Sequence, residues 1–373
     1  MNITIPRKDL LRLVSRCQGV AGKKSAMPAL SNVLLTAAAE GALRVSATDM
    51  YLSVTGSAPA DVTEPGSVAL PARELFERVK AMPEGPVTIS VADGAQTTIK
   101  ASGAARRFTI HGIPGGDFPP LPSVAKGATA HSLPVATLSA LISHTQFSVS
   151  TDETRAHVNS TLFEFSPGQM RAVSTDGHRL SKVEMAADGT EGAATMLVPL
   201  KAIGELRRLA DAAEDDAAVT ITQSGPNAFF DFADARFSVK LVYAQFPPYA
   251  QVIPKKSETL VRVPRVPFAD ALDAVRIAAS DRTGGVRLHV EPGLLRITAE
   301  APGEGNGADE VCCECEDSAG PIGANAKYFL DVLQALGCDE VELGISGDLD
   351  PITVRPLGDG APAFIAVVMP MKC

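Results

Sequence analysis

The chain has 373 residues, which is enough for two or three domains with buried cores. Hydrophobic residues make up 45% and charged residues 21%, the proportions of an ordinary globular protein rather than a disordered or fibrous one. The net charge of −9 taken alone argues against nucleic-acid binding, because phosphate contacts need clustered Lys and Arg. The opening MNITIPRKDLLRLV has no apolar run of signal-peptide or membrane-span length, so we expect a cytoplasmic protein.

The first predicted elements are a short strand and an amphipathic helix over residues 6–18, which opens at Pro6. A β-hairpin, LRVSATDMYLSVTG, is predicted from Leu43, because apolar residues alternate on both sides of a turn. A second helix is predicted over residues 71–82 in VALPARELFERVKAM. The β-like run VTISV follows it, and RRFTIHGIPGGDFPPLP closes the segment.

The same order of elements recurs twice along the chain. LPVATLSALISHTQ and VPRVPFADALDAVRIAA repeat the first helix, and Pro134 and Pro264 follow Pro6 at spacings of 128 and 130 residues. The hairpin recurs as MRAVSTDGHRLSKVEM from Met170 and, with a longer acidic glycine-rich loop, as LLRITAEAPGEGNGADEVCCECE from Leu294. The four further helices are predicted over residues 134–146, 199–211, 264–280 and 324–336.

These matches predict one structural unit written three times. Each unit is predicted as strand, helix, three strands, helix, three strands, which is an α+β unit with two helices on one face of an antiparallel sheet. The domains are predicted at residues 1–125, 126–255 and 256–373. Repeated units on one chain can bend into an arc, and an arc can close into a ring by pairing head to tail with a second copy.

The positive charge is concentrated in the predicted helices. They carry a net charge of +5, which leaves −14 for the rest of a chain whose total is −9. A ring with basic helices on its inner wall could hold a polyanion loosely, while its acidic exterior repels one. Solvated helix faces are the alternative reading of the same charges.

Several segments resemble the beta subunit of bacterial DNA polymerase III, the replicative sliding clamp family. The resemblance covers essentially the whole chain, and it rests on ATDMYLSV, STDGHRLS, FPPYAQVIP, ANAKYFLDVL and the terminal VVMPMK in that order. It implies the DNA clamp fold, with three clamp-type domains forming half of a closed ring. It also implies a homodimer around double-stranded DNA that tethers the replicative polymerase, without catalysis of its own and without a cofactor. An external ATPase clamp loader is implied as a further partner.

The resemblance also implies a pocket for partner peptides between the second and third domains. Methionine and aliphatic side chains would give an adaptable groove for short peptides with apolar anchors. Simple core packing is the alternative reading for any one of these residues. The implied pocket residues are Val158, Thr175, Gly177, His178, Arg179, Leu180, Pro247, Val252, Asn325, Tyr328, Leu349, Val367, Met369, Pro370 and Met371.

Other functional residues are carried over from the family in the same way. Lys24, Arg73 and Lys201 are expected to face DNA, and Phe108, Ile110 and Ile277 to lie at the dimer interface. The chain departs from the family at Lys24, where arginine is common, and at Ala278, where leucine is common. Further departures are Gln251, His157 and Cys373, which affect the expected peptide preference.

Three other interpretations carry less weight. Asp176 and His178 could form an acid–base pair of an enzyme, but no nucleophile accompanies them in the sequence. Cys312, Cys313 and Cys315 are too closely spaced for a typical zinc site, so we expect reduced thiols and no bound metal. The GVAGKKS segment lacks the P-loop spacing. A clamp-like paralogue with a specialised or inhibitor-resistant role remains open beside the main replicative clamp.

Overall fold

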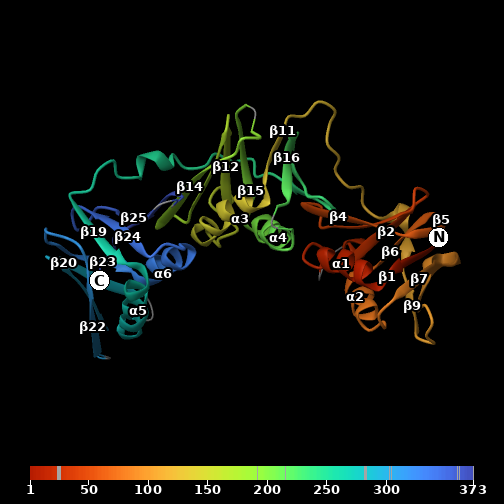
Figure 1. Cartoon of the computed structure of the whole chain (residues 1–373), viewed down its shortest axis with the longest axis horizontal. Helices are drawn as coiled ribbons and strands as arrows, with labels where there is room; N and C mark the ends of the chain where they lie inside the picture. The colour runs from red at the N-terminus through yellow and green to blue at the C-terminus, as the bar shows by residue number, and fades with distance from the viewer. Residues whose placement is uncertain are drawn as a thin grey trace. The chain divides into compact units, whose positions relative to one another are not determined.

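The structure is a computed structural model of the chain (Figure 1) that describes residues 1–22, 27–190, 192–214, 216–280, 284–301, 303, 305–358, 360 and 362–372. Six α-helices and 26 β-strands are present within these residues. They fall into two compact units. The N-terminal unit comprises Met1–Ala136 and Gly204–Leu241, and the C-terminal unit comprises Thr137–Ile203 and Val242–Cys373.

Two antiparallel sheets form the N-terminal unit. Their strands are β1 (Asn2–Pro6), β2 (Asn32–Ala38), β3 (Ala42–Thr48), β4 (Leu52–Pro59), β5 (Asp61–Glu64), β6 (Gly66–Pro71), β7 (Pro86–Val91), β8 (Gln96–Ala101), β9 (Arg107–His111), β10 (Ile113–Pro114), β11 (Ala130–Pro134), β16 (Ala218–Ser224), β17 (Asn227–Asp231) and β18 (Ala235–Lys240). One sheet has the order β5-β1-β7-β8-β9, and the other β10-β6-β2-β3-β4-β18-β17-β16-β11.

The C-terminal unit also contains two antiparallel sheets. Their strands are β12 (Ser160–Ser166), β13 (Gln169–Thr175), β14 (Arg179–Ala186), β15 (Ala194–Pro199), β19 (Thr259–Pro264), β20 (Gly285–Glu291), β21 (Leu294–Ala301), β22 (Gly305–Cys312), β23 (Ala319–Asn325), β24 (Glu340–Ile345), β25 (Ile352–Pro356) and β26 (Ala363–Val368). The orders are β15-β12-β13-β14-β26-β25-β24-β19 and β22-β21-β20-β23.

All six predicted helices are confirmed. They are α1 (Arg7–Cys17), α2 (Ala72–Lys80), α3 (Val135–Ser143), α4 (Leu200–Asp211), α5 (Arg265–Val275) and α6 (Ala326–Ala335). The first five each follow a proline that is the last residue of the preceding strand. Proline suits this junction because its ring fixes φ near the helical value and it has no N–H to leave unpaired. The sixth helix instead begins after Asn325, whose side chain accepts a hydrogen bond from the Lys327 N–H as an N-cap.

The prediction of three strands between the two helices of each unit was wrong. Four strands form the sheet there in the second and third repeats, and the first repeat adds the short β5. The overlooked strands are β6, β15 and β23, which lead directly into the second helix. They are short segments directly before the predicted helices, and a run of this length does not by itself distinguish a strand from the start of a helix.

Each helix buries one apolar face. The residues Leu10, Leu13 and Val14 of α1 are inaccessible to solvent, and α1 packs against α2. In the C-terminal unit Phe268 of α5 meets Phe329 of α6 edge-on, with ring centroids 6.0 Å apart. The five described cysteines are free thiols, and burial raises the pKa of Cys17 to about 12.

The large sheets run across the sequence repeats. Strand β4 of the first repeat pairs with β18 of the second, and β14 of the second pairs with β26 of the third. The central repeat therefore contributes strands to both units, and the predicted limits at residues 125 and 255 stay a prediction. Among the described residues, the helices are all too short or too polar to cross a membrane.

Candidate functional site

The first part of the candidate site is the tight turn between β13 and β14. The Thr175 hydroxyl donates to the Arg179 carbonyl at 2.6 Å and accepts from the Gly177 N–H at 3.1 Å. Asp176 Oδ1 accepts the N–H groups of His178 and Arg179 at 2.8 and 3.0 Å. Gly177 has φ +94°, a conformation that glycine adopts at little cost. The TDGHR sequence thus fixes the turn with its own side chains.

Arg179 joins this turn to helix α6. Its guanidinium donates to Asp176 Oδ2 at 3.0 Å and to Asp331 Oδ2 at 2.5 Å. It also lies over the Tyr328 ring, 4.6 Å from the centroid, and is only 9% exposed. Burial and the nearby Asp176 charge raise the pKa of Tyr328. The carboxylate of Asp176 is therefore occupied in a structural ion pair.

The C-terminal strand forms the next part of the site. In the register of β14 and β26, Arg179 is opposite Val368 and Leu180 is opposite Val367. Beyond the strand, the Met369 N–H donates to the His178 carbonyl at 2.9 Å, and the Met371 N–H donates to the Gly323 carbonyl at 2.8 Å. Residues 369–372 (hereafter the tail) are thus held against the turn on one side and against β23 on the other.

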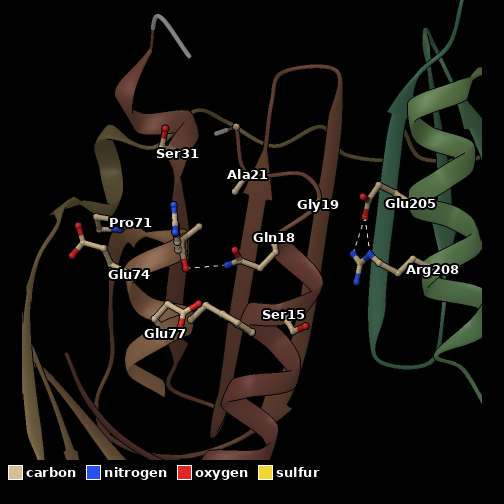
Figure 2. Close-up of a pocket in the computed structure, with 14 residues that line it drawn as sticks. Ser15, Gln18, Gly19, Ala21, Ser31, Pro71, Glu74, Glu77, Glu205 and Arg208 are labelled. Carbon is tan, nitrogen blue, oxygen red and sulfur yellow. Dashed lines mark hydrogen bonds and ion pairs between the residues drawn. The ribbon is translucent and has the colours of Figure 1, made fainter. Parts of the chain in front are cut away.

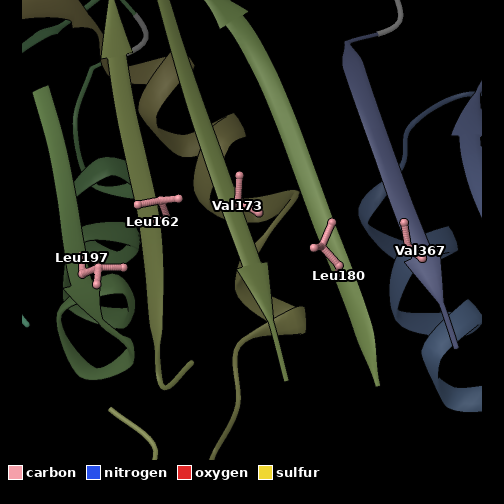
Figure 3. Packing of buried hydrophobic residues seen from close by; sticks show 5 residues of the cluster. All are labelled: Leu162, Val173, Leu180, Leu197 and Val367. Carbon is pink, nitrogen blue, oxygen red and sulfur yellow. The ribbon is translucent and has the colours of Figure 1, made fainter. Parts of the chain in front are cut away.

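A segment without regular strands, residues 242–253 (hereafter the linker), covers this part of the sheet. An apolar cluster crosses the sheet at this place (Figure 3). It is formed by buried side chains of five adjacent strands, Leu162, Val173, Leu180, Leu197 and Val367. The linker packs Val242, Phe246, Tyr249 and Ile253 onto this cluster. The linker is therefore held largely by the burial of apolar side chains.

The turn, the strand end, the linker and the segment before β12 line a cavity of about 190 Å³. Nine of the predicted pocket residues lie on its wall: Val158, Thr175, Gly177, Arg179, Leu180, Pro247, Val252, Val367 and Met369. Two wall residues, Arg155 and Tyr249, were missed by the sequence analysis. Tyr249 lies inside the FPPYAQVIP segment, so its place was signalled, whereas Arg155 has no sequence signal of its own.

The other predicted pocket residues lie around the cavity. His178 and Met371 take part in the backbone bonds of the tail, and Pro370 lies between Met369 and Met371. Asn325 caps α6, and Tyr328 flanks Arg179. Leu349 is 70% exposed on the loop after β24.

The first repeat contains the same turn between β3 and β4. The Thr48 hydroxyl donates to Leu52 and accepts from the Met50 N–H, and Asp49 Oδ1 accepts from the Tyr51 and Leu52 N–H groups. The Lys240 N–H donates to the Tyr51 carbonyl at 2.8 Å, just as Met369 does to His178. However, Ser46, Ser53 and Ser238 occupy the positions of Val173, Leu180 and Val367. Three serines cannot form the apolar floor, so the repeated turn does not repeat the cavity.

Most arginines of the basic helices form ion pairs or backbone bonds within the chain. Arg7 contacts Glu84, Arg12 and Arg16 contact Asp234, and Arg208 contacts Glu205. Glu84 and Asp234 lie outside the predicted helices, so their pairs lower the free positive charge below the predicted +5, whereas Glu205 is already counted in that value. The hollow in the N-terminal unit shown in Figure 2 has carboxylates from Glu74, Glu77 and Glu205 on its wall.

The structure describes two of the three predicted DNA-facing residues, and both are exposed. Arg73 is exposed on α2 and lines that hollow, and Lys201 is exposed on α4. Lys24 lies outside the described residues. Of the predicted interface residues, Ile277 is 82% exposed and Phe108 is half-buried on β9. Ile110 is 1% exposed, so its side chain packs inside its own unit.

The cysteine-rich end of β22 does not form a metal site within the described part of the chain, where no group of three or more His, Cys, Asp or Glu side chains could hold an ion. Cys312 is exposed, and Cys313 and Cys315 are half-buried. Burial raises the pKa of the Cys313 thiol to about 11. The residues fit free thiols better than metal ligands, which need the thiolate form.

Comparison with known proteins decides the family. Models of the DNA polymerase III beta subunit match the chain three times: the N-terminal domain at residues 1–122, the central domain at 132–248 and the C-terminal domain at 250–372. The chain belongs to the DNA polymerase III beta subunit family. This family is a non-catalytic processivity factor whose members bind DNA polymerase and other partners.

Individual relatives agree with this assignment over their whole length. The beta sliding clamp of Caulobacter vibrioides is 31% identical and that of Escherichia coli is 30% identical, each with complete coverage of both chains. A crystal structure of a sliding clamp from Pseudomonas aeruginosa bound to griselimycin superimposes with a TM-score of 0.94 at 31% identity, again with complete coverage of both chains. The predicted clamp fold is thereby confirmed.

Proposed function

We propose that this chain is the processivity clamp of a bacterial replicative polymerase, working in the cytoplasm as a dimeric ring around duplex DNA. Its three domains are residues 1–125, 126–255 and 256–373. The cavity at the β13–β14 turn holds short peptides of the polymerase, the clamp loader and other partners. The observation that carries this proposal is the cavity itself, whose apolar floor is not repeated at the equivalent turn of the first repeat and is completed by the C-terminal strand β26.

The chemistry of the cavity suits a peptide with apolar anchors. Val158, Leu180, Val367 and Met369 offer aliphatic and thioether surface. Met adapts to different side chains, and a few polar groups at the rim can orient a peptide backbone. The remaining carried-over residues, His178, Asn325, Tyr328, Leu349, Pro370 and Met371, are proposed to contact the parts of the peptide outside the cavity.

The repeat suggests how two copies would join. Inside the chain, β4 pairs with β18 and β14 pairs with β26. The equivalent strands left over are β22 in the third repeat and β9 in the first, and each lies at the edge of its sheet in the described residues. We infer that β22 of one chain pairs with β9 of a second copy. Two such junctions give a closed dimer with twofold symmetry.

The register of this junction follows from the two internal ones. Aligning RFTIH of β9 with RFSVK of β18 places Arg106 opposite Asp309, and Arg107 diagonally opposite Glu310. Opposite charges at such cross-strand positions favour pairing. Phe108 and Ile277 are proposed to bury apolar surface at the same junction. Lys24, Arg73 and Lys201 are proposed to face the DNA.

Topological linkage to DNA tests the function. The purified protein should have twice the single-chain mass of 38.8 kDa in light scattering. Once placed on a closed circular DNA by a clamp loader, it should stay bound in high salt and leave when the circle is cut. Electrostatic contact alone would instead weaken steeply with salt on both DNAs. A monomer that is not retained on the circle would refute the proposal.

Removal of the tail tests the pocket. Deleting residues 369–373 removes Met369 from the cavity wall and the backbone bond to His178. We expect the binding of a polymerase-derived peptide to fall below detection in a fluorescence titration, while the dimer mass is unchanged. Unchanged peptide affinity would show that the cavity is not the binding site.

A further inference from the structure

A line of charged residues crosses the sheet beside the apolar cluster. Glu164 of β12 is opposite Arg171 of β13, and Arg171 is opposite Glu184 of β14. Arg171 Nη1 donates to Glu164 Oε2 at 3.0 Å, and its Nε donates to Glu184 Oε1 at 2.9 Å. The side chains of Gln169 and Lys182 also bind Glu184. The arginine is therefore held between two carboxylates on three adjacent strands.

This line of charges reaches the linker through one side chain. The Tyr249 hydroxyl donates to Glu164 Oε2 at 2.7 Å and accepts from Arg171 Nη1 at 3.1 Å. Burial, followed by the bond to Glu164, raises the pKa of Tyr249, so the hydroxyl keeps its proton as a donor. Its ring meets Phe246 edge-on at 6.3 Å and also forms part of the cavity wall.

The linker needs such an attachment. Its only regular element is the short 3₁₀ turn Tyr249–Gln251, and it joins no sheet. In the described residues, its backbone bond to the sheet is the one from the Val242 N–H to the Leu197 carbonyl on β15 at 3.0 Å, so side chains must fix the distance of Tyr249 from β13 and β14. Apolar packing holds it down but is not directional. A directional bond from Tyr249 is what can set the position of the wall that Pro247, Tyr249 and Val252 present to the cavity.

We propose that Glu164 and Arg171 are positioning residues for the peptide cavity and act through the Tyr249 hydroxyl. The bond network holds the linker at one distance from the turn and so sets the width of the cavity and its affinity for peptides. This inference rests on the proposed peptide-binding function. Nothing in the cavity itself requires the two charged residues, because neither lies on its wall.

The test compares conservative variants in peptide binding. Tyr249→Phe removes the hydroxyl and keeps the ring, and it should weaken binding of a fluorescein-labelled peptide with leucine and phenylalanine anchors about fivefold, the equivalent of one lost hydrogen bond. Glu164→Ala should have a similar effect. Glu164→Gln keeps an acceptor for Tyr249 and should lose less affinity than Glu164→Ala. Tyr243→Phe is the matched control, because Tyr243 lies in the same linker and is fully exposed.

Hydrogen exchange gives a second measurement that needs no peptide. In Tyr249→Phe, the amides of residues 242–253 should exchange faster, while those of β13 and β14 keep their protection. Unchanged peptide affinity in Tyr249→Phe, with only a lower melting temperature, would overturn the positioning role and leave the cavity's function intact. Absence of peptide binding by the unaltered protein would instead overturn the peptide-binding function itself.

Discussion

At the scale of single residues, Arg179 connects more of the site than any other side chain described above. It is paired with a carboxylate in its own turn and another on α6, and its guanidinium lies 5.8 Å from the ring centroid of Phe147 and 4.6 Å from that of Tyr328. Its alkyl stem and guanidinium are 9% exposed. A lysine could supply the charge but not the planar fork that contacts Asp176 and Asp331 together.

Replacing Arg179 with alanine should therefore cost stability as well as binding. The change leaves Asp176 and Asp331 without their partner in a largely buried place, and we expect the free energy of unfolding to fall by about 3 kcal/mol in urea titrations. Arg276→Ala is the control, because its pair with Asp273 is half exposed on both sides. That pair should contribute less than about 1 kcal/mol. Equal losses in the two variants would contradict this role for Arg179.

At the scale of elements, the two Thr-Asp turns share one backbone conformation but have different residues at the position with a positive φ. The third residue has a positive φ in both, +94° at Gly177 and +76° at Met50. A side chain there costs energy because its Cβ crowds the backbone. Met50 is 54% exposed, so its side chain gains little from packing in return.

Exchanging residue types at these two positions should have opposite effects on stability. Gly177→Ala should lower the free energy of unfolding by about 1 kcal/mol, from backbone strain, since the added Cβ would meet only the Arg155 side chain at 3.5 Å. Met50→Gly should raise it by up to about 1 kcal/mol, because relief of strain exceeds the added freedom of the unfolded chain. Thermal unfolding of both variants measures the difference. A stabilising Gly177→Ala would show that the turn is not the source of the strain.

At the scale of the whole molecule, charge has two separate roles. Many helix arginines form ion pairs within the chain, as Arg12 and Arg16 do with Asp234. At the two sheet edges the charges are instead opposite: Arg107 lies on β9 with Arg106 just before it, and Asp309 and Glu310 lie on β22. At the proposed junction, charges placed this way would specify the partner edge and its register more than they add affinity.

The proposed junction predicts a charge-reversal rescue. Arg106→Glu with Arg107→Glu should raise the dimer dissociation constant at least about tenfold, because like charges then face each other. Adding Asp309→Lys and Glu310→Lys in the same chain should restore much of the affinity in sedimentation equilibrium. Arg44→Glu, a reversal at an exposed side chain of the interior strand β3, should leave dimerisation unchanged. If the variant with all four substitutions does not regain dimer affinity, this register is wrong.

The sequence alone determined the six helices, the Thr-Asp turn and the repeat, but not the strands β6, β15 and β23. Pro6, Pro134 and Pro264 predicted the starts of three helices, and the structure has a proline before five of the six. The TDGHR residues make the hydrogen bonds of their own turn, so both features depend on neighbours in the chain. Family resemblance supplied most of the cavity wall, from segments that carry a recognisable pattern.

Only the tertiary structure decided the features that depend on distant contacts. It paired β14 with β26, laid the linker on the apolar cluster, and brought Tyr249 to Glu164 across 85 residues of sequence. It also paired helix arginines with distant carboxylates that a count of charges treats as independent, such as Arg16 with Asp234. These contacts depend on packing and on which charged side chains the fold brings together, and no local sequence pattern predicts them.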